Sequence, residues 1–479
     1  MLFNSFAYAL FLPIVFLLYW YIPHKYRWGL LLASSYYFYM SWNPKYIVLI
    51  LFTTIVSYVA ARLLEKEERY SVRRLILTIA LLACLGVLFL FKYYNFFSEN
   101  IVALCRAMAI NLQPTTLDLL LPVGISFYTF QTLSYVVDVY NKKVPVEHHF
   151  GIYATFISFF PQLVAGPIER TSNLLPQIKE EHTFDYNQAT YGLKLMAWGF
   201  FKKLVIADVL SKYVQTVYAA PHSYQGFALV LASVFFTIQI YCDFSGYSDI
   251  AIGTAKLLGI NLMTNFRNPY LSASVREFWS RWHISLSTWF RDYVYIPLGG
   301  NRVGSVRRVI NLLVTFLVSG LWHGANWTFV VWGGLHGIAQ VVENIFVGKA
   351  KRDYHGIVWL VRVVCIFSFC SFAWIFFVSE SLPDAWYVIT HMFDGIEHPL
   401  FYLRKGCKDI DFGRFQLNSM LVLLTVLLAY DCLSLKYDVI EKIGAMKKWK
   451  RWSIYLFIVM IIVFFSEKGV AAEFVYFQF

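Results

Sequence analysis

The amino-acid sequence predicts an all-α protein that crosses a membrane about nine to twelve times. Hydrophobic residues make up 58% of its 479 positions and charged residues only 15%, whereas about 25% of a soluble domain is charged. Many segments without Asp, Glu, Lys or Arg approach the roughly 20 residues that a helix needs to cross the hydrocarbon core. These segments are Met1–Pro23, Trp28–Pro44, Tyr46–Ala61, Leu75–Phe91, Leu119–Val137, Phe150–Ile168, Tyr213–Cys242, Val309–Val342, Val363–Ser379, Phe415–Tyr430 and Trp452–Ser466.

The sequence pattern indicates one membrane domain, residues 1–479, in three parts. Residues 1–94 contain simple apolar spans with short loops, residues 95–345 are irregular, and residues 346–479 return to simple spans and a tail. Met1–Pro23 lacks the basic start and the small-residue cleavage site of a signal peptide. We therefore expect it to be the first span.

The net charge of +12 is explained by basic residues beside apolar segments rather than by nucleic-acid binding. The positive-inside rule places Lys25–Arg27, Arg62–Arg74 and Lys447–Arg451 in the cytoplasm. This orientation puts the N-terminus and the C-terminus outside the cytoplasm. A basic cytoplasmic face also attracts anionic membrane lipids or a phosphate-bearing molecule.

Helix-breaking residues interrupt apolar stretches in the middle part. Leu121–Gly124 and Phe160–Gln162 each contain a proline, and Ala165–Pro167 ends another stretch. Non-helical backbone at membrane depth is tolerated only where protein or water covers it. We therefore expect re-entrant segments around a cavity.

Two segments have the pattern of helices that lie flat at the membrane interface. From Val275 to Tyr293, apolar residues recur on one helical face and arginines fall elsewhere. In Tyr191–Tyr218, lysines are interspersed among apolar positions. Both segments are therefore predicted to be continuous amphipathic helices.

The sequence contains no metal-ligand spacing. Its seven cysteines form no CxxC pair and are scattered in apolar runs, which favours packing in the core. A long apolar run is followed by Asp243, Ser245, Tyr247 and Asp249, which could bind a cation, but Gly246 and the alternation of these residues favour a turn and a helix cap. We expect no metal and no bound cofactor.

His323 is the strongest candidate for chemistry. No Asp, Glu, Lys or Arg occurs between Val309 and Val342, and an ionisable side chain inside an apolar span is a functional candidate by default. A histidine can accept and return a proton near neutral pH. The alternative is a histidine that only hydrogen-bonds between helices.

Two other histidines are open to structural interpretations. Gly333 and Gly337 around His336 form a small-xxx-small pattern, which favours a packing histidine with a local partner. His283 lies between Trp282 and Ile284 on a predicted interfacial helix, where a lone histidine is usually structural.

An ordered set of motifs resembles the bacterial branch of the membrane-bound O-acyltransferase family. This branch includes proteins of alginate O-acetylation, peptidoglycan O-acetylation and D-alanyl transfer to teichoic acids. The matching stretches are Leu121–Phe127, Phe160–Ile168, Asp243–Asp249, Asn265–Tyr270, Phe278–Leu286 and Ser319–Trp327.

The resemblance implies helices around a central tunnel and a catalytic role for His323. It also implies a second polar residue about forty positions earlier, where this chain has His283. His323 would be the general base, and His283 would donate to the oxyanion or hold the acceptor. The weaker candidates are His336, Trp322, Trp279 and Asn265, with the indoles expected to exclude water.

The resemblance further implies a multi-pass protein of the bacterial cytoplasmic (inner) membrane that exports an acyl group. The expected donor is acetyl-CoA or an acyl-carrier thioester, and the acceptor an extracytoplasmic polysaccharide or peptidoglycan. The expected partners are a secreted or membrane-anchored SGNH-type acyltransferase and possibly an acyl-carrier protein. Candidate contacts to a phosphate-bearing donor are Lys202, Lys203, Arg307 and Arg308.

Two alternatives remain beside acetyl transfer. The first is D-alanyl transfer from an acyl-carrier protein to teichoic acid. The second is a transporter without covalent chemistry, although the inverted repeats and paired broken helices typical of transporters are not visible.

The segment Glu473–Phe479 ends in alternating aromatic residues around Tyr476. One interpretation is an aromatic anchor at the membrane interface. The other is an acyl relay, in which the Tyr476 phenol receives the acyl group near His323 and passes it to a secreted transferase. Similar aromatic-Tyr-aromatic endings in the family support the relay.

Overall fold

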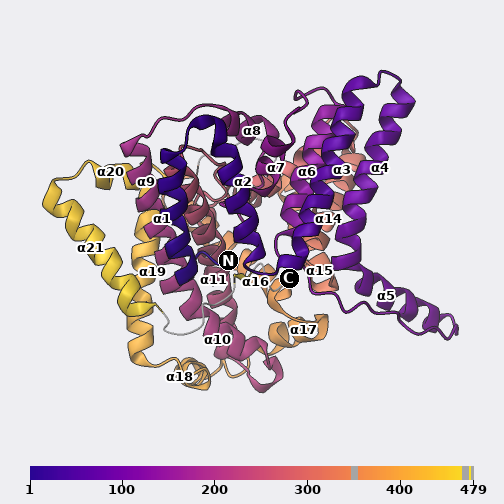
Figure 1. Ribbon diagram of the computed structural model, residues 1–479. Helices are drawn as coiled ribbons and strands as arrows, with labels where there is room; N and C mark the ends of the chain where they lie inside the picture. Colours follow the sequence, from indigo (N-terminus) through magenta and orange to yellow (C-terminus); the bar gives the residue numbers. More distant parts are fainter. Residues whose placement is uncertain (347–353, 467–473, 476–479) are drawn as a thin grey trace. The chain divides into compact units, whose positions relative to one another are not determined.

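The computed structural model describes residues 1–346, 354–466 and 474–475. Every regular element within these ranges is helical (Figure 1). Six of the described helical segments are long and apolar enough to cross a membrane: Pro44–Lys66, Tyr70–Ala107, Phe227–Leu257, Ser305–His323, Gly356–Val378 and Arg414–Ser434. An all-α, multi-pass membrane fold is thereby confirmed. The expected nine to twelve crossings would require shorter apolar helices, such as Phe6–Tyr21, to cross as well.

The chain divides into two units, residues 1–193 with 250–263, and residues 194–249 with 264–479. The first unit contains α1 (Phe6–Tyr21), α2 (His24–Met40), α3 (Ile47–Lys66), α4 (Tyr70–Leu88), α5 (Tyr94–Ala107), α6 (Ile125–Tyr140), α7 (Phe150–Ser158) and α8 (Thr171–Lys179). The second contains α10 (Asp208–Tyr218), α12 (Val275–Arg281), α13 (Ile284–Phe290), α14 (Ser305–His323), α15 (Trp327–Phe346), α16 (Gly356–Val378), α17 (Leu382–His391), α18 (Pro399–Asp409), α19 (Arg414–Ser434), α20 (Val439–Gly444) and α21 (Lys448–Phe465). Helices α9 (Tyr186–Phe200) and α11 (Phe227–Leu257) contribute residues to both units.

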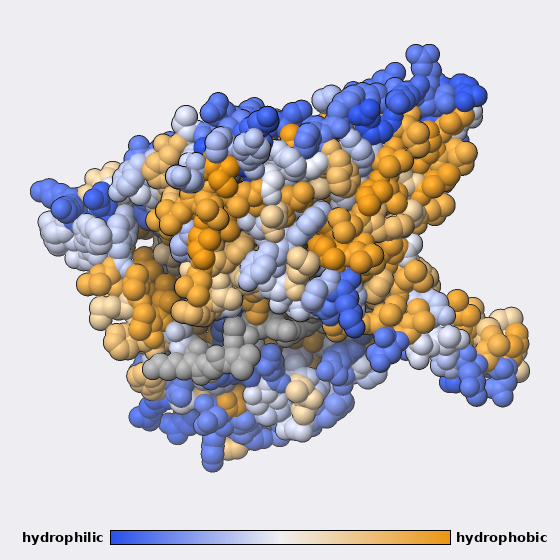
Figure 2. Space-filling model, viewed as in Figure 1, coloured by the Kyte–Doolittle hydropathy of each residue, from blue (hydrophilic) through white to orange (hydrophobic). Residues whose placement is uncertain are grey.

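Helices α3 and α4 form an antiparallel pair (Figure 1). Leu75, Ile79 and Leu82 of α4 are each more than half exposed. Figure 2 shows hydrophobic residues along this pair and hydrophilic residues at the turn between the helices. A protein surface of this kind is stable in contact with lipid and costly in contact with water.

The two predicted helix interruptions pack against each other inside the first unit. Helix α6 starts after Gly124, whose φ of +76° is left-handed, and α7 ends at Ser158, before Phe160–Gln162. A Cβ atom on Gly124 would lie 2.7 Å from the carbonyl oxygen of Leu163. Glycine is therefore required both by the backbone conformation and by the close approach of the second interruption.

Three buried tryptophans form the centre of the second unit. Trp332 on α15 stacks on Trp374 of α16 with ring centroids 5.3 Å apart, and Trp282 lies 5.2 Å from Trp374. Each is at most 1% exposed. Large rigid side chains that pack at this distance fix the helices that carry them. This aromatic core supports the ends of α14 and α15, where the site lies.

The expectation of a continuous interfacial helix from Val275 to Tyr293 is wrong. The segment consists of two short helices, α12 and α13, and the helix breaks at Trp282 and His283. His283 has φ +42° and ψ +55°, which a continuous α-helix cannot contain. The amphipathic period continues across the break, which is why the pattern did not show it.

We expected the polar residues after the long apolar run to form a turn and a helix cap, and this expectation is wrong. Asp243, Ser245 and Asp249 lie inside the continuous helix α11. Their partners come from the π-helical turn η3 (Phe201–Ala207): Lys202 donates to Ser245 Oγ at 2.8 Å and pairs with Asp249 at 2.7 Å. Lys202 and Lys203 are both buried, whereas Lys212 is exposed, so two of the lysines in Tyr191–Tyr218 do not face solvent as they would on a flat amphipathic helix.

Candidate functional site

His323 is the last residue of α14 and lies in an aromatic enclosure. Its ring centroid is 4.9 Å from Trp322, 5.0 Å from Trp332 and 5.3 Å from Phe377, all in edge-to-face arrangements. Only 4% of the residue is exposed. An imidazole held this way has a fixed orientation and little access to water.

Glycines bring α14 and α15 close enough to form this enclosure. A Cβ on Gly320 would lie 2.3 Å from the carbonyl oxygen of Phe329, and a Cβ on Gly333 would lie 2.4 Å from that of Phe316. Real Cβ atoms do not approach a backbone oxygen so closely. The two glycines therefore set the distance between the helices and, with it, the contact between His323 and Trp332.

The replacement Gly333→Ala is expected to lower the thermal midpoint. The added methyl must push α15 away from Phe316, and overpacking of this kind costs about 1–3 kcal/mol. Gly334→Ala is the matched control, because a Cβ there would meet only Leu317 Cδ2 at 3.6 Å, an ordinary contact. Thermal unfolding in detergent compares the two variants. Equal behaviour would show that the close approach at Gly333 has no role.

His283 lies between α12 and α13, where the backbone and side chain of Asn265 hold it and the residues after it. The Asn265 backbone oxygen accepts from Ile284 N at 2.9 Å. Its Oδ1 lies 3.0 Å from His283 Nδ1 and accepts from Ser285 N at 3.3 Å and Ser285 Oγ at 3.0 Å. These contacts stabilise the left-handed backbone of His283, which is unfavourable for a residue with a side chain.

The same contacts determine which ring nitrogen of His283 is basic. Asn265 Oδ1 can only accept, so His283 Nδ1 carries the proton and Nε2 keeps the lone pair. Complete burial lowers the pKa of His283 to about 3. The ring is therefore neutral near pH 7 and presents Nε2 as a hydrogen-bond acceptor.

The two histidines meet at one indole. Trp322 contacts His323 and also lies 6.2 Å from the His283 ring. The structure thus gathers His323, His283 and Trp322, three residues predicted from the sequence, with Asn265 behind His283. Trp332 and Phe377 were not predicted: they reach His323 from α15, which packs against α14, and from α16.

His336 is separated from His323 by Trp332. Its ring lies 5.1 Å from Trp332, and its Nδ1 accepts a hydrogen bond from Trp279 Nε1 at 3.3 Å. It is completely buried. This is the local partner expected for a packing histidine, and it places His336 and Trp279 one layer behind His323.

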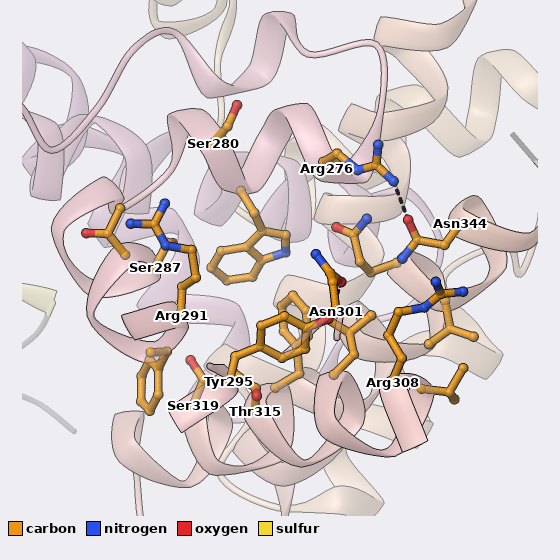
Figure 3. A pocket seen from close by; sticks show the side chains of 18 of the residues that line it. Arg276, Ser280, Ser287, Arg291, Tyr295, Asn301, Arg308, Thr315, Ser319 and Asn344 are labelled. Atoms are coloured by element: carbon orange, nitrogen blue, oxygen red, sulfur yellow. Dashed lines mark hydrogen bonds between the residues drawn. The ribbon is translucent and has the colours of Figure 1, made fainter. Parts of the chain in front are cut away.

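A basic cavity of about 720 Å³ lies beside this site (Figure 3). Arg276, Arg291 and Arg308 line it, and none of its described lining residues is a carboxylate. Arg291 is paired with Asp292 at 2.8 Å. Its wall also includes Trp279, Ile284 and Ser319, residues that adjoin the histidine site along the chain or through contacts. Arg276 is held by a hydrogen bond to Asn344. The cavity can therefore accommodate an anionic molecule close to the histidines.

Comparison with known proteins gives the chain a family. The model of the membrane-bound O-acyltransferase family matches residues 143–379. A probable alginate O-acetylase AlgI of Azotobacter vinelandii is 38% identical over 88% of this chain and 81% of its own length. The chain belongs to the membrane-bound O-acyltransferase family. It is therefore an acyltransferase, and a transporter without covalent chemistry is no longer a rival interpretation.

Two further relatives of this acyltransferase differ in their named activity. A peptidoglycan O-acetyltransferase of Helicobacter pylori is 34% identical over 83% of this chain and 79% of its own length. A teichoic acid D-alanyltransferase of Streptococcus thermophilus is 29% identical over 53% of this chain and 65% of its own length. The matched family region contains His283, His323 and His336.

Of the four residues expected to contact the acyl donor, one lies at the cavity. Arg308 lines it, whereas its neighbour Arg307 is exposed and does not. Lys203 is 1% exposed and bound between two carboxylates, so the expectation that it contacts a donor is wrong. Lys202 is likewise buried and paired, at a second, polar cavity of about 440 Å³.

Tyr476, the expected acyl relay, lies outside the residues that the structure describes. The two preceding residues, Phe474 and Val475, are described and buried.

Proposed function

We propose that this enzyme transfers an acetyl group from a cytoplasmic thioester for the O-acetylation of an extracytoplasmic polysaccharide or of peptidoglycan. The observation that supports acetyl transfer is the similarity to two relatives named for O-acetylation, each over more than four-fifths of this chain. The D-alanyl relative matches a smaller share and at lower identity.

His323 is the general base in this proposal. It removes the proton from an attacking hydroxyl while the oxygen forms a bond to the thioester carbonyl carbon. When the tetrahedral intermediate collapses, the carbon–sulfur bond breaks and the proton passes from His323 to the leaving thiolate. The products are an ester and a free thiol, and His323 returns to its neutral form.

His283 holds the attacking hydroxyl in this proposal. Its Nδ1–H is engaged with Asn265, so the neutral ring offers only the Nε2 lone pair. A lone pair accepts a hydrogen bond from a hydroxyl but cannot stabilise an oxyanion. Of the two roles considered from the sequence, the geometry therefore favours holding the acceptor.

The tryptophans protect the reaction from water. Trp322 and Trp332 cover two sides of His323 and are at most 4% exposed. Water at this site would hydrolyse the thioester before transfer. Trp279 and His336 stabilise this wall from behind through their hydrogen bond.

The arginine-lined cavity receives the phosphate-bearing part of the donor. Coenzyme A and the arm of an acyl-carrier protein both carry phosphate on a flexible chain that ends in the thioester. Arg276, Arg291 and Arg308 offer hydrogen bonds that suit phosphate oxygens.

The test measures the transfer of labelled acetyl groups from acetyl-CoA by the full-length enzyme in liposomes. Alginate oligosaccharides or peptidoglycan fragments serve as acceptors, and a crude membrane fraction is added. Label should appear as an ester, and free thiol should be released in equal amount. Activity with a D-alanyl carrier thioester, and none with acetyl-CoA, would replace acetyl transfer by the D-alanyl alternative.

Within that assay, Arg308→Gln is expected to raise the KM for acetyl-CoA about five- to tenfold and to change kcat much less. One lost charged hydrogen bond is worth about 1–1.5 kcal/mol here. Arg307→Gln removes the same charge one position earlier, outside the cavity, and should leave KM within about twofold of wild type. If the two variants raise the KM for acetyl-CoA equally, the effect comes from the overall surface charge and not from a contact in the cavity.

A further inference from the structure

A buried ionic cluster in the second unit is not used by the mechanism above. The ammonium of Lys203 lies 2.6 Å from Asp243 Oδ1 and 2.8 Å from Asp208 Oδ1. All three residues are less than 10% exposed. Lys203 is thus shared by two buried carboxylates, and a buried carboxylate is stable only when hydrogen-bond donors or cations reach its oxygens.

A donor comes from a segment far along the chain. The backbone N–H of Val475 donates to Asp243 Oδ2 at 2.7 Å. Asp243 therefore uses one oxygen for Lys203 and the other for Val475. The adjoining ring of Phe474 lies over the Lys203 ammonium at 4.3 Å and meets Tyr247 edge-on at 4.4 Å. Phe474 and Val475 are 1% and 4% exposed.

A glycine on α11 makes the cluster possible. A Cβ on Gly246 would lie 2.8 Å from the carbonyl oxygen of Gly199 and 3.2 Å from the backbone nitrogen of Lys203. The missing side chain lets η3 approach α11 closely enough for Lys203 to reach Asp243. Burial disfavours the charged ammonium, but Asp243 and Asp208 outweigh this effect and raise the pKa of Lys203.

We propose that Lys203, Asp208 and Asp243 form a docking socket for the segment at residues 474–475, and that this docking fixes the register of the aromatic tail for acyl transfer. An aromatic tail could be held by apolar contacts alone, but such contacts do not distinguish one aromatic residue of Phe474–Phe479 from the next. The Phe474 ring on Lys203 and Tyr247, together with the neighbouring Val475 N–H on Asp243, holds two consecutive residues at once and thereby fixes one register. The functional part of this inference rests on the proposed acyl transfer; the binding part does not.

Hydrogen exchange measures the docking directly. In the full-length protein in detergent, the Val475 amide should exchange about tenfold or more slowly than in a free peptide of the same sequence. Asp243→Asn weakens the pairing with Lys203 and makes residue 243 a poorer acceptor for the Val475 N–H. The exchange rate of the Val475 amide should then return to within about threefold of its rate in the free peptide. The control is Glu397→Gln, an equal charge change at an exposed residue of the same unit. A Val475 amide that is unprotected in the wild type overturns the socket.

Tail variants test the function while leaving the ionic cluster intact. Val475→Pro removes the N–H that Asp243 binds and is expected to lower kcat about tenfold or more, with the KM for acetyl-CoA within about twofold of wild type. The thermal midpoint should fall modestly, because Asp243 Oδ2 loses a buried donor. Val475→Ala keeps the N–H and should keep its contact with the Asp243 carboxylate. Slow hydrogen exchange at the amide of residue 475 in this variant would report that contact. Wild-type kcat for Val475→Pro overturns the role in transfer. If the wild type itself moves no acetyl group, the proposed function fails, while the exchange result still decides the socket.

Discussion

His323→Ala is expected to reduce acyl transfer by about 10²–10⁴-fold while the protein still inserts into the membrane. The variant removes the base from an enclosure formed by Trp322, Trp332 and Phe377, so some loss of stability from the cavity is also expected. His323→Gln fills most of that space without a basic nitrogen of comparable pKa and should be equally inactive. Single-turnover release of free thiol from the acyl donor measures the step.

His336→Gln is the matched control for this result. His336 is also a buried histidine in contact with Trp332, so its replacement disturbs the same aromatic core without reaching the proposed reacting atoms. We expect a lower thermal midpoint and a much smaller loss of rate than for His323→Gln. Near wild-type transfer by His323→Gln would show that His323 is not the base.

Tyr476→Phe is expected to abolish acylation of the polymer and to leave membrane abundance unchanged. In the relay, the phenol oxygen attacks the thioester carbonyl, His323 takes the phenol proton, and the thiol leaves with that proton. The tyrosine ester then gives its acyl group to an acceptor hydroxyl and regains a proton. The phenylalanine variant keeps the aromatic ring and lacks only the nucleophile, so an interface anchor would be unaffected.

A mass measurement separates the relay from the anchor a second way. When the downstream transferase is absent, the peptide that contains Tyr476 should gain the mass of one acyl group in the wild type and none in Tyr476→Phe. Phe477→Leu is a suitable control, because it changes the neighbouring aromatic residue and keeps the phenol. A fully active Tyr476→Phe enzyme would contradict the relay.

The sequence predicted the features of this fold that depend on local composition. The uncharged segments indicated membrane helices because each must satisfy its own backbone in lipid. The prolines near Gly124 and Phe160 indicated interruptions because proline cannot continue a helix. His323 became a candidate for the same kind of reason, since it is isolated in a segment that otherwise excludes charge.

Features that depend on distant partners were not predictable from the pattern. The break at His283 needs φ above zero, and the oxygen atoms of Asn265, eighteen residues earlier, stabilise it. The apolar period continues on both sides of this break, so the sequence pattern does not show the break. Lys203 and Asp243 look like ordinary surface and capping residues along the chain, and only their pairing forty residues apart makes them buried groups.

The contact between Val475 and Asp243 also has a consequence for biosynthesis. The two residues are 232 positions apart, and chains are made at about 5–20 residues per second. Asp243 therefore enters the membrane with its helix well before the ribosome adds Val475. During that interval, Lys203 is already present, but Asp243 Oδ2 has not yet received the hydrogen bond from Val475. Completion of the ionic cluster is thus a late event in maturation, and a ribosome that stops before Val475 releases an enzyme whose buried charge stays incompletely bound.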